Sequence, residues 1–392
     1  MSELASEIAE ALSKARGHKS ADGSYNYLRT APGVVNSEED KALDRLLRDA
    51  VAVRASDLHI LAGSKPKARV DGRLVPLEGW PELDGEATKA VLSAILTREA
   101  AEEFERDGDL DMSYTEKEAG RFRVNYYKQK GCWSAVFRTL ASRIPSPEEL
   151  GIPPQVVDLI NKKRGLILVT GPTGSGKSTT LASLIQEINR RYEHNIITLE
   201  DPIEYLHAND LKSNVAQREM GMDSRSFASG LKAALREDPD VILVGEMRDP
   251  ETIQTAVTAA ETGHLVFSTL HTMGAANTID RIVDSYPPSQ QGQARSQLAS
   301  ILECVMSQAL LPRAEGKGRV AAFEIMLGTT AIKAQISEGK TKTIGQYMQP
   351  SLGMQTLDQH LLNLVIEGAV TPEAALEFAQ DKRALSERLG VY

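Results

Sequence analysis

Cysteine is scarce in this chain. Its 392 residues include only Cys132 and Cys304, and no Cys-x-x-Cys pair occurs. A structural zinc site built on thiolates needs several such ligands at close spacing, so we expect no zinc. The simplest interpretation is two reduced thiols in a cytosolic protein. Stability must then come from hydrophobic cores, for which a hydrophobic content of 41% is sufficient.

Basic charge and aromatic residues are also in short supply. Lysine and arginine number 45 against 54 acidic residues, which gives a net charge of −9, and aromatics make up 5% of the chain. Proteins that bind nucleic acid without sequence preference usually carry a basic footprint and aromatic stacking surfaces. We therefore expect no nucleic-acid partner, although a local basic groove remains open.

Long hydrophobic runs are missing as well. No apolar stretch approaches the roughly 20 residues that cross a bilayer. The segment "MSELASEIAEALSKARGHKS" mixes acids and bases without a hydrophobic centre and is not typical of a signal peptide. We expect a cytoplasmic protein, which leaves docking on a membrane partner possible.

Turn-forming residues divide the chain into four parts. Residues 1–36 predict an extension with a short amphipathic helix and a linker rich in Gly, Ser, Asn and Pro. Residues 37–142 predict a small α+β domain. Residues 143–155 hold four prolines and form a linker, because proline disfavours helices and interior strands. Residues 156–392 form the second domain.

The small domain shows helix and hairpin signals. Ser37 resembles the start of a capping box before an apolar helical face. Asp71-Gly72 separates two extended runs, a strong two-residue hairpin signal, and a second hairpin is expected to turn near Gly131. Residues 84–106 have a helical pattern.

The second domain alternates short apolar runs with helical segments. The runs are "GLILVT", "NIITLED", "DVILVGE" and "HLVFSTL". Near-continuous apolar strands separated by helices indicate a parallel sheet covered on both faces. The last ~80 residues are mostly helical by pattern.

A phosphate-binding loop follows the first of these runs. "GPTGSGKS" matches G-x-x-x-x-G-K-[ST] in full, with a strand before it and a helix after it. Glycines let backbone N–H groups curl around phosphate at the positive end of the helix, Lys177 reaches the β- and γ-phosphates, and the Ser178 hydroxyl faces Mg²⁺. We assign the nucleotide site to Gly171, Pro172, Thr173, Gly174, Ser175, Gly176, Lys177, Ser178 and Thr179.

Carboxylates follow two other strands. Glu246 ends an apolar strand, where a Mg²⁺-bound water needs an acid, and one strand is expected between it and the phosphate-binding loop. Glu200, Asp201 and Glu204 end the intervening strand, and carboxylates this close repel one another unless something positive or a polarised water lies among them. We interpret Glu204 as the base that prepares the attacking water; a solvated acidic loop is the alternative.

Two histidines flank the last apolar strand. His264 and His271 are separated by roughly 20–23 Å of extended chain, so they cannot hold one ion as a local pair. His271 lies at the carboxyl end of the strand, where open α/β sheets bind ligands. It is a candidate γ-phosphate sensor, and a structural role is the alternative.

Together and in this order, these segments resemble the secretion-type hexameric ATPases of type IV pili and of type II and type IV secretion. The matching pieces are "GPTGSGKST", "ITLEDPIEY", "LREDPDVILVGEMRD" and "TGHLVFSTLHT", and "ASDLHI", "RVDGRL" and "GRFRVNYY…AVFRTL" match the family's N-terminal domain. "GMQTLDQ" at residues 353–359 is similar to the PilT group of pilus retraction motors, whereas "AIKAQISEGK" at residues 331–340 departs from that group's "AIRNLIREGK". The tetracysteine module of the assembly and type II secretion members is missing.

The resemblance implies a RecA-like P-loop ATPase domain, with a mostly parallel sheet, preceded by a PAS-like α+β domain. It also implies a homohexamer that binds ATP and Mg²⁺ between the two domains. Family members supply arginines from the N-terminal domain to the phosphates, and here Arg123 and Arg138 are favoured over Arg121. A cation aimed at the γ-phosphate stabilises charge as the bond breaks. Strand arginines at alternating positions can also be a solvated face.

The implied function is a motor at the inner membrane. It would power type IV pilus retraction and twitching motility by acting on a PilC-like platform protein, and on the pilin filament only indirectly. The alternative within the family is a PilT paralogue or a type IVB secretion ATPase that powers protein export. A RecA-like nucleic-acid motor and a nucleotide-gated scaffold without turnover are competing interpretations outside it.

Overall fold

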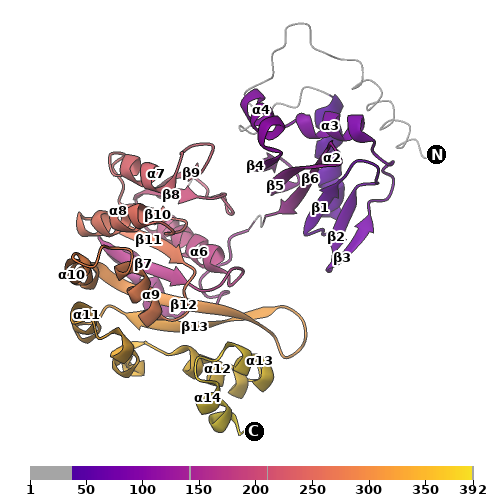
Figure 1. The fold of residues 1–392 in the computed structure, drawn as a ribbon. Coiled ribbons are helices and arrows are strands. Elements are labelled where there is room, and N and C mark those ends of the chain that lie inside the picture. Colours follow the sequence, from indigo (N-terminus) through magenta and orange to yellow (C-terminus); the bar gives the residue numbers. More distant parts are fainter. Residues whose placement is uncertain (1–37, 141–142, 210, 391–392) are drawn as a thin grey trace. The chain divides into compact units, whose positions relative to one another are not determined.

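The chain divides into two compact units, Met1–Ser142 and Arg143–Tyr392 (Figure 1). The computed structural model describes residues 38–140, 143–209 and 211–390. The helix and linker expected within residues 1–36, and the cap expected at Ser37, lie outside the described residues.

Unit 1 is an antiparallel sheet with helices packed on its apolar face. Its elements are α2 (Glu38–Ala52), β1 (Asp57–Ile60), β2 (Lys67–Val70), β3 (Arg73–Pro76), α3 (Gly85–Ser93), α4 (Arg98–Asp107), β4 (Asp109–Glu116), β5 (Gly120–Gln129) and β6 (Cys132–Thr139). The strand order is β3-β2-β1-β6-β5-β4. Phe122, Val124 and Phe137 are buried in one core with Leu43 and Leu46 of α2. Alternation along the strands selects the buried face.

Both predicted hairpins of unit 1 are confirmed. Asp71 and Gly72 have φ values of +47° and +79°, and Lys130 and Gly131 have +52° and +78°. Two consecutive positive φ angles give the twist that joins adjacent antiparallel strands. The helical stretch expected over residues 84–106 is confirmed as α3 and α4. Strand β4, which pairs with β5 at the sheet edge, was not expected.

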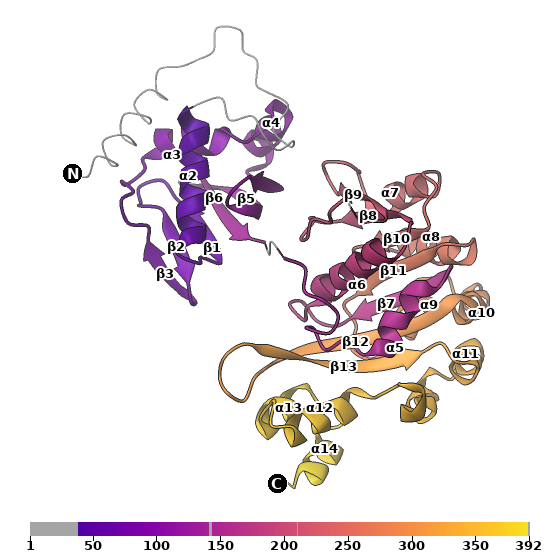
Figure 2. The same ribbon diagram turned by 180° about the vertical axis from the view of Figure 1, so that it is seen from behind.

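Unit 2 is a largely parallel sheet with helices on both faces (Figures 1 and 2). Its first half contains α5 (Pro154–Val157), a 3₁₀ turn (Asp158–Asn161), β7 (Gly165–Thr170), α6 (Lys177–Arg191), β8 (Asn195–Glu200), β9 (Asn214–Glu219), α7 (Phe227–Ala234), β10 (Val241–Val244), α8 (Pro250–Glu261) and β11 (Leu265–Leu270). Its second half contains α9 (Ala275–Val283), α10 (Gln291–Ile301), β12 (Leu302–Pro312), β13 (Arg319–Leu327), α11 (Thr330–Ser337), 3₁₀ turns at Thr341–Tyr347 and Pro350–Leu352, α12 (Leu357–Ile366), α13 (Pro372–Phe378) and α14 (Lys382–Leu389).

The strand order of unit 2 is β13-β12-β7-β11-β10-β8-β9. The four apolar runs form β7, β8, β10 and β11, which are parallel as predicted. Their alternate residues face two separate cores, one against α6 and the other against α8, α9 and α10. A strand buried on both faces has to be apolar at nearly every position.

One expectation about unit 2 needs correction. One strand was expected between the phosphate-binding loop and the strand of Glu246, but β8 and β9 both intervene in sequence. Strand β9 was missed because its residues, "NVAQRE", are polar at a sheet edge. The last ~80 residues are mostly helical as predicted, but β12 and β13, which form an antiparallel hairpin, were not expected. Within the described part of the chain, none of the helices combines the length and the hydrophobicity that crossing a bilayer requires.

Candidate active site

The phosphate-binding loop joins β7 to α6 through backbone that only glycine adopts easily. Gly171, Gly174 and Gly176 have φ values of +142°, +77° and +88°. A Cβ atom added to Gly171 would lie 2.2 Å from the carbonyl oxygen of Gln308. Gly176 is the residue that caps α6, and it offers no side-chain acceptor. The first N–H groups of α6 are therefore left for an external anion.

Lys177 lies beneath this loop and is only 8% exposed. Its Nζ donates to the carbonyl oxygens of Gly171 and Pro172, each at 3.0 Å. Burial lowers the pKa of Lys177, while the charges of Glu246 and Glu204 act in the opposite direction. The structure therefore brings both predicted acids within electrostatic reach of the loop's lysine.

Gln308 on β12 braces the same loop, and sequence reasoning missed it. Its side chain is 1% exposed. Nε2 donates to the Ser175 carbonyl oxygen at 2.5 Å, and Oε1 accepts from the Thr180 hydroxyl at 3.0 Å. The two contacts lie on either side of Gly176 and Lys177, so one amide joins the end of the loop to the first turn of α6.

Glu246 and His271 come together at the carboxyl ends of two neighbouring strands. β10 and β11 are paired in parallel. Glu246 Oε2 lies 3.4 Å from His271 Nε2, and Glu246 Oε1 lies 2.7 Å from Arg248 Nε. The Thr269 hydroxyl donates to the Gly245 carbonyl oxygen at 2.6 Å, which fixes the two strand ends against each other. His264 lies at the opposite end of β11 and contacts the Ala259 carbonyl oxygen through Nδ1 at 2.9 Å.

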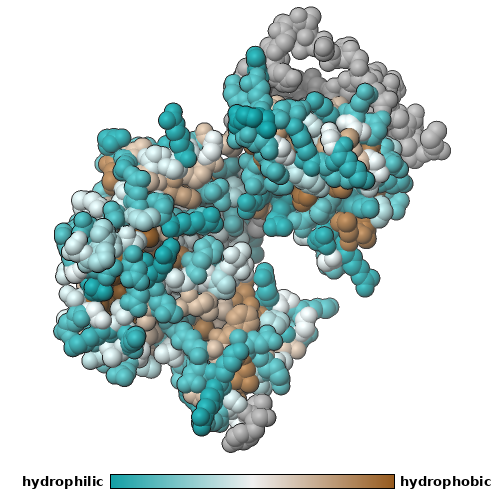
Figure 3. Space-filling view, in the orientation of Figure 1, coloured by the Kyte–Doolittle hydropathy of each residue, from teal (hydrophilic) through white to brown (hydrophobic). Residues whose placement is uncertain are grey.

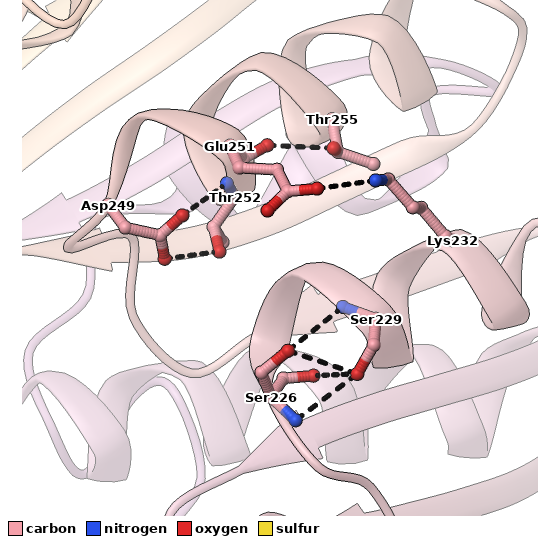
Figure 4. A network of polar contacts seen from close by, with 7 residues as sticks. All are labelled: Ser226, Ser229, Lys232, Asp249, Glu251, Thr252 and Thr255. Atoms are coloured by element: carbon pink, nitrogen blue, oxygen red, sulfur yellow. Dashed lines mark hydrogen bonds and ion pairs between the residues drawn. The ribbon is translucent and has the colours of Figure 1, made fainter.

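The segment after Glu246 is anchored by a helix cap. Asp249 accepts from the Thr252 N–H at 2.8 Å and from its hydroxyl at 2.6 Å (Figure 4). Burial raises the pKa of Asp249, but the bonds from Thr252 outweigh it and the pKa is lowered overall. Figure 4 also shows Lys232 of α7 paired with Glu251 of α8. The cap holds α8 directly behind the Glu246 turn.

Glu204 lies in a loop that is tied down on both sides. The Ile203 N–H donates to Glu219 Oε2 at 3.0 Å. The Tyr205 hydroxyl lies 2.9 Å from the Thr179 hydroxyl on α6. Gln217 Nε2 donates to the Tyr205 carbonyl oxygen at 2.8 Å. Contacts from α6 and β9 thus flank Glu204, which argues against a loose acidic loop.

Glu200, by contrast, is engaged within the sheet. It accepts from the Thr198 hydroxyl at 2.6 Å and from Gln217 Nε2 at 3.1 Å. Of the three predicted carboxylates, Glu200 is therefore braced within the sheet, whereas Asp201 is exposed. Gln217 and Glu219 were not expected at the site, because β9 itself was missed.

Comparison with known proteins decides the family. The family described as "Type II/IV secretion system protein" matches residues 36–377. The chain belongs to this family. It is 46% identical over 340 residues to the type IV pilus retraction ATPase PilT of Pseudomonas aeruginosa, covering 86% of this chain and 98% of that protein. It is 44% identical over 343 residues to a twitching motility protein of Neisseria gonorrhoeae, covering 87% and 91%.

Solved structures agree with this assignment. A crystal structure of the pilus retraction motor PilT with bound ADP superposes with a TM-score of 0.84 at 46% identity, covering 88% of this chain and 98% of that one. The predicted resemblance and the RecA-like fold are confirmed. The chain is a PilT-like secretion ATPase that uses a nucleotide.

The residues of this ATPase fit a magnesium nucleotide. Within the described residues, the buried Ser175 hydroxyl has no hydrogen-bond partner, and Pro172, Thr173, Gly174 and Ser178 are exposed around it. No group of three or more His, Cys, Asp or Glu residues in the described ranges is arranged to hold a metal. Mg²⁺ is usually held by one or two carboxylates together with phosphate oxygens, so it does not need a ready-made cluster of protein ligands.

The two predicted arginines belong to unit 1, where they are neighbours. Arg123 on β5 stands directly opposite Arg138 on β6. Arg138 Nε lies 2.9 Å from Asp57 Oδ1, and Arg123 Nε lies 3.9 Å from Asp111 Oδ1. The Arg123–Asp111 pair is exposed on both sides and is therefore weak, whereas the Asp57 carboxylate that faces Arg138 is only 10% exposed. Arg121 is bound to Ser113 and Thr115.

Proposed function

We propose that this protein powers type IV pilus retraction, and so twitching motility, through ATP hydrolysis. The match to a retraction ATPase over 98% of that protein's length is the observation that carries the proposal. The site supports it, because the phosphate-binding loop holds a buried lysine, Lys177, within electrostatic reach of Glu204 and Glu246.

The residues of the site have separate roles in this proposal. The loop from Gly171 to Thr179 holds the phosphates, and Lys177 exchanges its loop carbonyl partners for phosphate oxygens. Glu204 accepts a proton from the attacking water, a role that suits a carboxylate fixed by its two neighbours. His271, in contact with Glu246, reports the state of the γ-phosphate.

Magnesium would be held by Ser178 directly and by Glu246 through water. When bound, it neutralises charge on the phosphate oxygens. Glu246 is suited to orienting a polar ligand because Arg248 and His271 approach different oxygens of its carboxylate.

A homohexamer completes the proposed site. Arg123 and Arg138 would reach the phosphates of a bound nucleotide and stabilise the charge that develops during hydrolysis. Their side-by-side placement on β5 and β6 presents two cations from one surface. The ring would turn a PilC-like platform protein at the cytoplasmic face of the inner membrane, and the pilin filament would follow.

A deletion strain tests the assigned process. Loss of twitching with surface pili retained, restored by the wild-type gene but not by Lys177→Ala, is the expected result. Twitching that persists together with a defect in protein export would instead establish the secretion alternative. That alternative rests only on the departures of "AIKAQISEGK" at residues 331–340 from the sequence of the PilT group.

The arginines are tested by mixing subunits. Arg123→Ala and Arg138→Ala should leave nucleotide binding nearly intact and reduce turnover, since their contribution is made as charge develops. If a neighbour supplies them, subunits with Lys177→Ala and subunits with Arg138→Ala should regain activity when assembled together. Mixed rings that stay inactive would show that the arginines do not act between subunits.

A further inference from the structure

The loop that follows His271 is in contact with the C-terminal helices, by which we mean α12, α13 and α14. These helices pack beside the β12–β13 hairpin (Figures 1 and 2). Met273, two residues after His271, packs against their hydrophobic core, which includes Leu361 and Leu385. Figure 3 shows hydrophobic residues at the surface in this part of unit 2, on a face that is otherwise mostly hydrophilic.

Glu324 of β13 holds the end of this loop. Helix α9 begins after Gly274, which has no side chain to cap the helix. The cap comes instead from the hairpin: Glu324 Oε1 accepts from the Ala275 N–H at 2.6 Å, and the Ser307 hydroxyl accepts from the Gly274 N–H at 3.0 Å. Ser307 and Glu324 are directly paired across β12 and β13. A carboxylate is favoured at this position because the helix N-terminus is positive.

Gln380 connects the same carboxylate to the C-terminal helices. Its Nε2 donates to Glu324 Oε2 at 2.8 Å. The same nitrogen lies 3.2 Å from the position that a Cβ on Gly274 would occupy, so it covers the backbone of the loop. Its own backbone is fixed, because the N–H groups of Gln380 and Asp381 both donate to the Asp358 carboxylate at 2.8 Å.

The two oxygens of Glu324 therefore have different partners. One holds the N-terminus of α9, four residues after His271, and the other holds the junction between α13 and α14. Glu324 is 5% exposed. A buried carboxylate that accepts hydrogen bonds on both oxygens has one preferred position. Losing either donor leaves one buried oxygen without that hydrogen bond.

We propose that Glu324 is a positioning residue for ATP hydrolysis, and that Gln380 lets the C-terminal helices set the place of the His271 loop. The inference rests on the role proposed for His271. A shift of the α13–α14 junction moves the Glu324 carboxylate, and the carboxylate moves the start of α9. The loop between His271 and α9 then shifts, which changes the 3.4 Å contact between His271 and Glu246. The nucleotide-binding loop is not part of this route.

Exchange of the two side chains tests the contact. In Gln380→Glu, two carboxylates face each other. We expect kcat to fall about tenfold, the equivalent of one weakened interaction of about 1.4 kcal/mol in the transition state, while KM and ADP affinity change less than twofold. In the double variant with Glu324→Gln, the amide and the carboxylate have changed places and the hydrogen bond is restored. Its kcat should return to within about threefold of the wild type.

Gln355→Glu is the matched control. Gln355 Nε2 donates to the Phe323 carbonyl oxygen at 3.0 Å, one residue from Glu324, and does not reach the loop. We expect this variant to lose thermal stability but to keep its kcat. All variants are measured as full-length protein, with Tm recorded beside kcat and KM.

The results separate the inference from the proposed function. If Gln380→Glu lowers only Tm, or lowers kcat no more than Gln355→Glu does, Glu324 has a structural role and the inference is wrong. The inference is also wrong if the double variant recovers Tm but not kcat. If His271→Ala itself leaves turnover unchanged, the role of His271 is wrong and the inference falls with it. If His271→Ala reduces turnover but Gln380→Glu keeps the wild-type kcat, only the inference is overturned.

Discussion

Replacing Gln308 with methionine should weaken nucleotide binding, although Gln308 is not expected to touch the nucleotide. Methionine has nearly the same length and volume, so the packing of β12 is preserved. Both hydrogen bonds are lost, and the Ser175 carbonyl oxygen and the Thr180 hydroxyl lose the partners that Gln308 provides. Each buried group left unsatisfied costs about 1–3 kcal/mol.

The size of the effect on binding follows from where the two bonds lie. They flank Gly176, whose left-handed backbone directs the loop's N–H groups toward the phosphate. Without ligand, the loop can relax and recover part of the free energy lost with the two hydrogen bonds. If it recovers about 1.4 kcal/mol, the nucleotide-bound form is disfavoured by that amount, and Kd for Mg-ADP rises about tenfold. Thr180→Val removes only one bond and should raise Kd by about threefold.

Titration with a fluorescent ADP analogue measures these changes, with circular dichroism recording Tm. Ser307→Ala is the control, since Ser307 precedes Gln308 on β12 but contacts the Gly274 N–H on the other face of the sheet. We expect its Kd for ADP to stay within twofold of the wild type. A Gln308→Met protein that is less stable but binds ADP normally would refute the reasoning.

Three further predictions concern the site and its surroundings. Lys177→Ala should abolish nucleotide binding in the same titration, since it removes the buried cation of the loop; detectable binding within tenfold of the wild type would contradict this. Glu204→Gln and Glu246→Gln should bind ATP and release no phosphate, and normal phosphate release by Glu204→Gln would exclude it as the base. Burial lowers the pKa of His207 from 6.5 to about 4, so the unfolded chain binds the proton first. The stability that this group contributes is complete above pH 6.5 and is lost as the pH falls toward 4, by at most about 3 kcal/mol. Urea unfolding of His207→Gln should therefore depend less on pH over that range, and curves parallel to those of the wild type would show that this shift is absent.

Local patterns were sufficient for much of the fold. Short apolar runs identified the parallel strands, and the Asp71-Gly72 pair and Gly131 marked the two hairpins. Each of these features depends on residues close together in the chain. Strands β4 and β9 were missed because they lie at sheet edges, where polar residues are tolerated and periodicity weakens.

The same division holds for the site. The phosphate-binding loop could be recognised from consecutive residues, because glycine torsions and a lysine at fixed spacing are local requirements. Gln308, by contrast, lies 128 positions from the Thr180 hydroxyl that it binds. Nothing in "VMSQALLP" distinguishes this glutamine from one that faces solvent, and only the pairing of β12 with β7 brings it under the loop.

The sequence by itself determined that the chain holds phosphate, that acids follow the neighbouring strands, and that a parallel sheet supports them. Only the tertiary structure decided that Glu200 is braced within the sheet, and that the N-terminus of α9, which follows the His271 loop, is capped by the Glu324 carboxylate of the β12–β13 hairpin. The physical reason is that a hydrogen bond requires two atoms about 3 Å apart. Between residues distant in sequence, that separation is set by strand order and register, which no local pattern encodes.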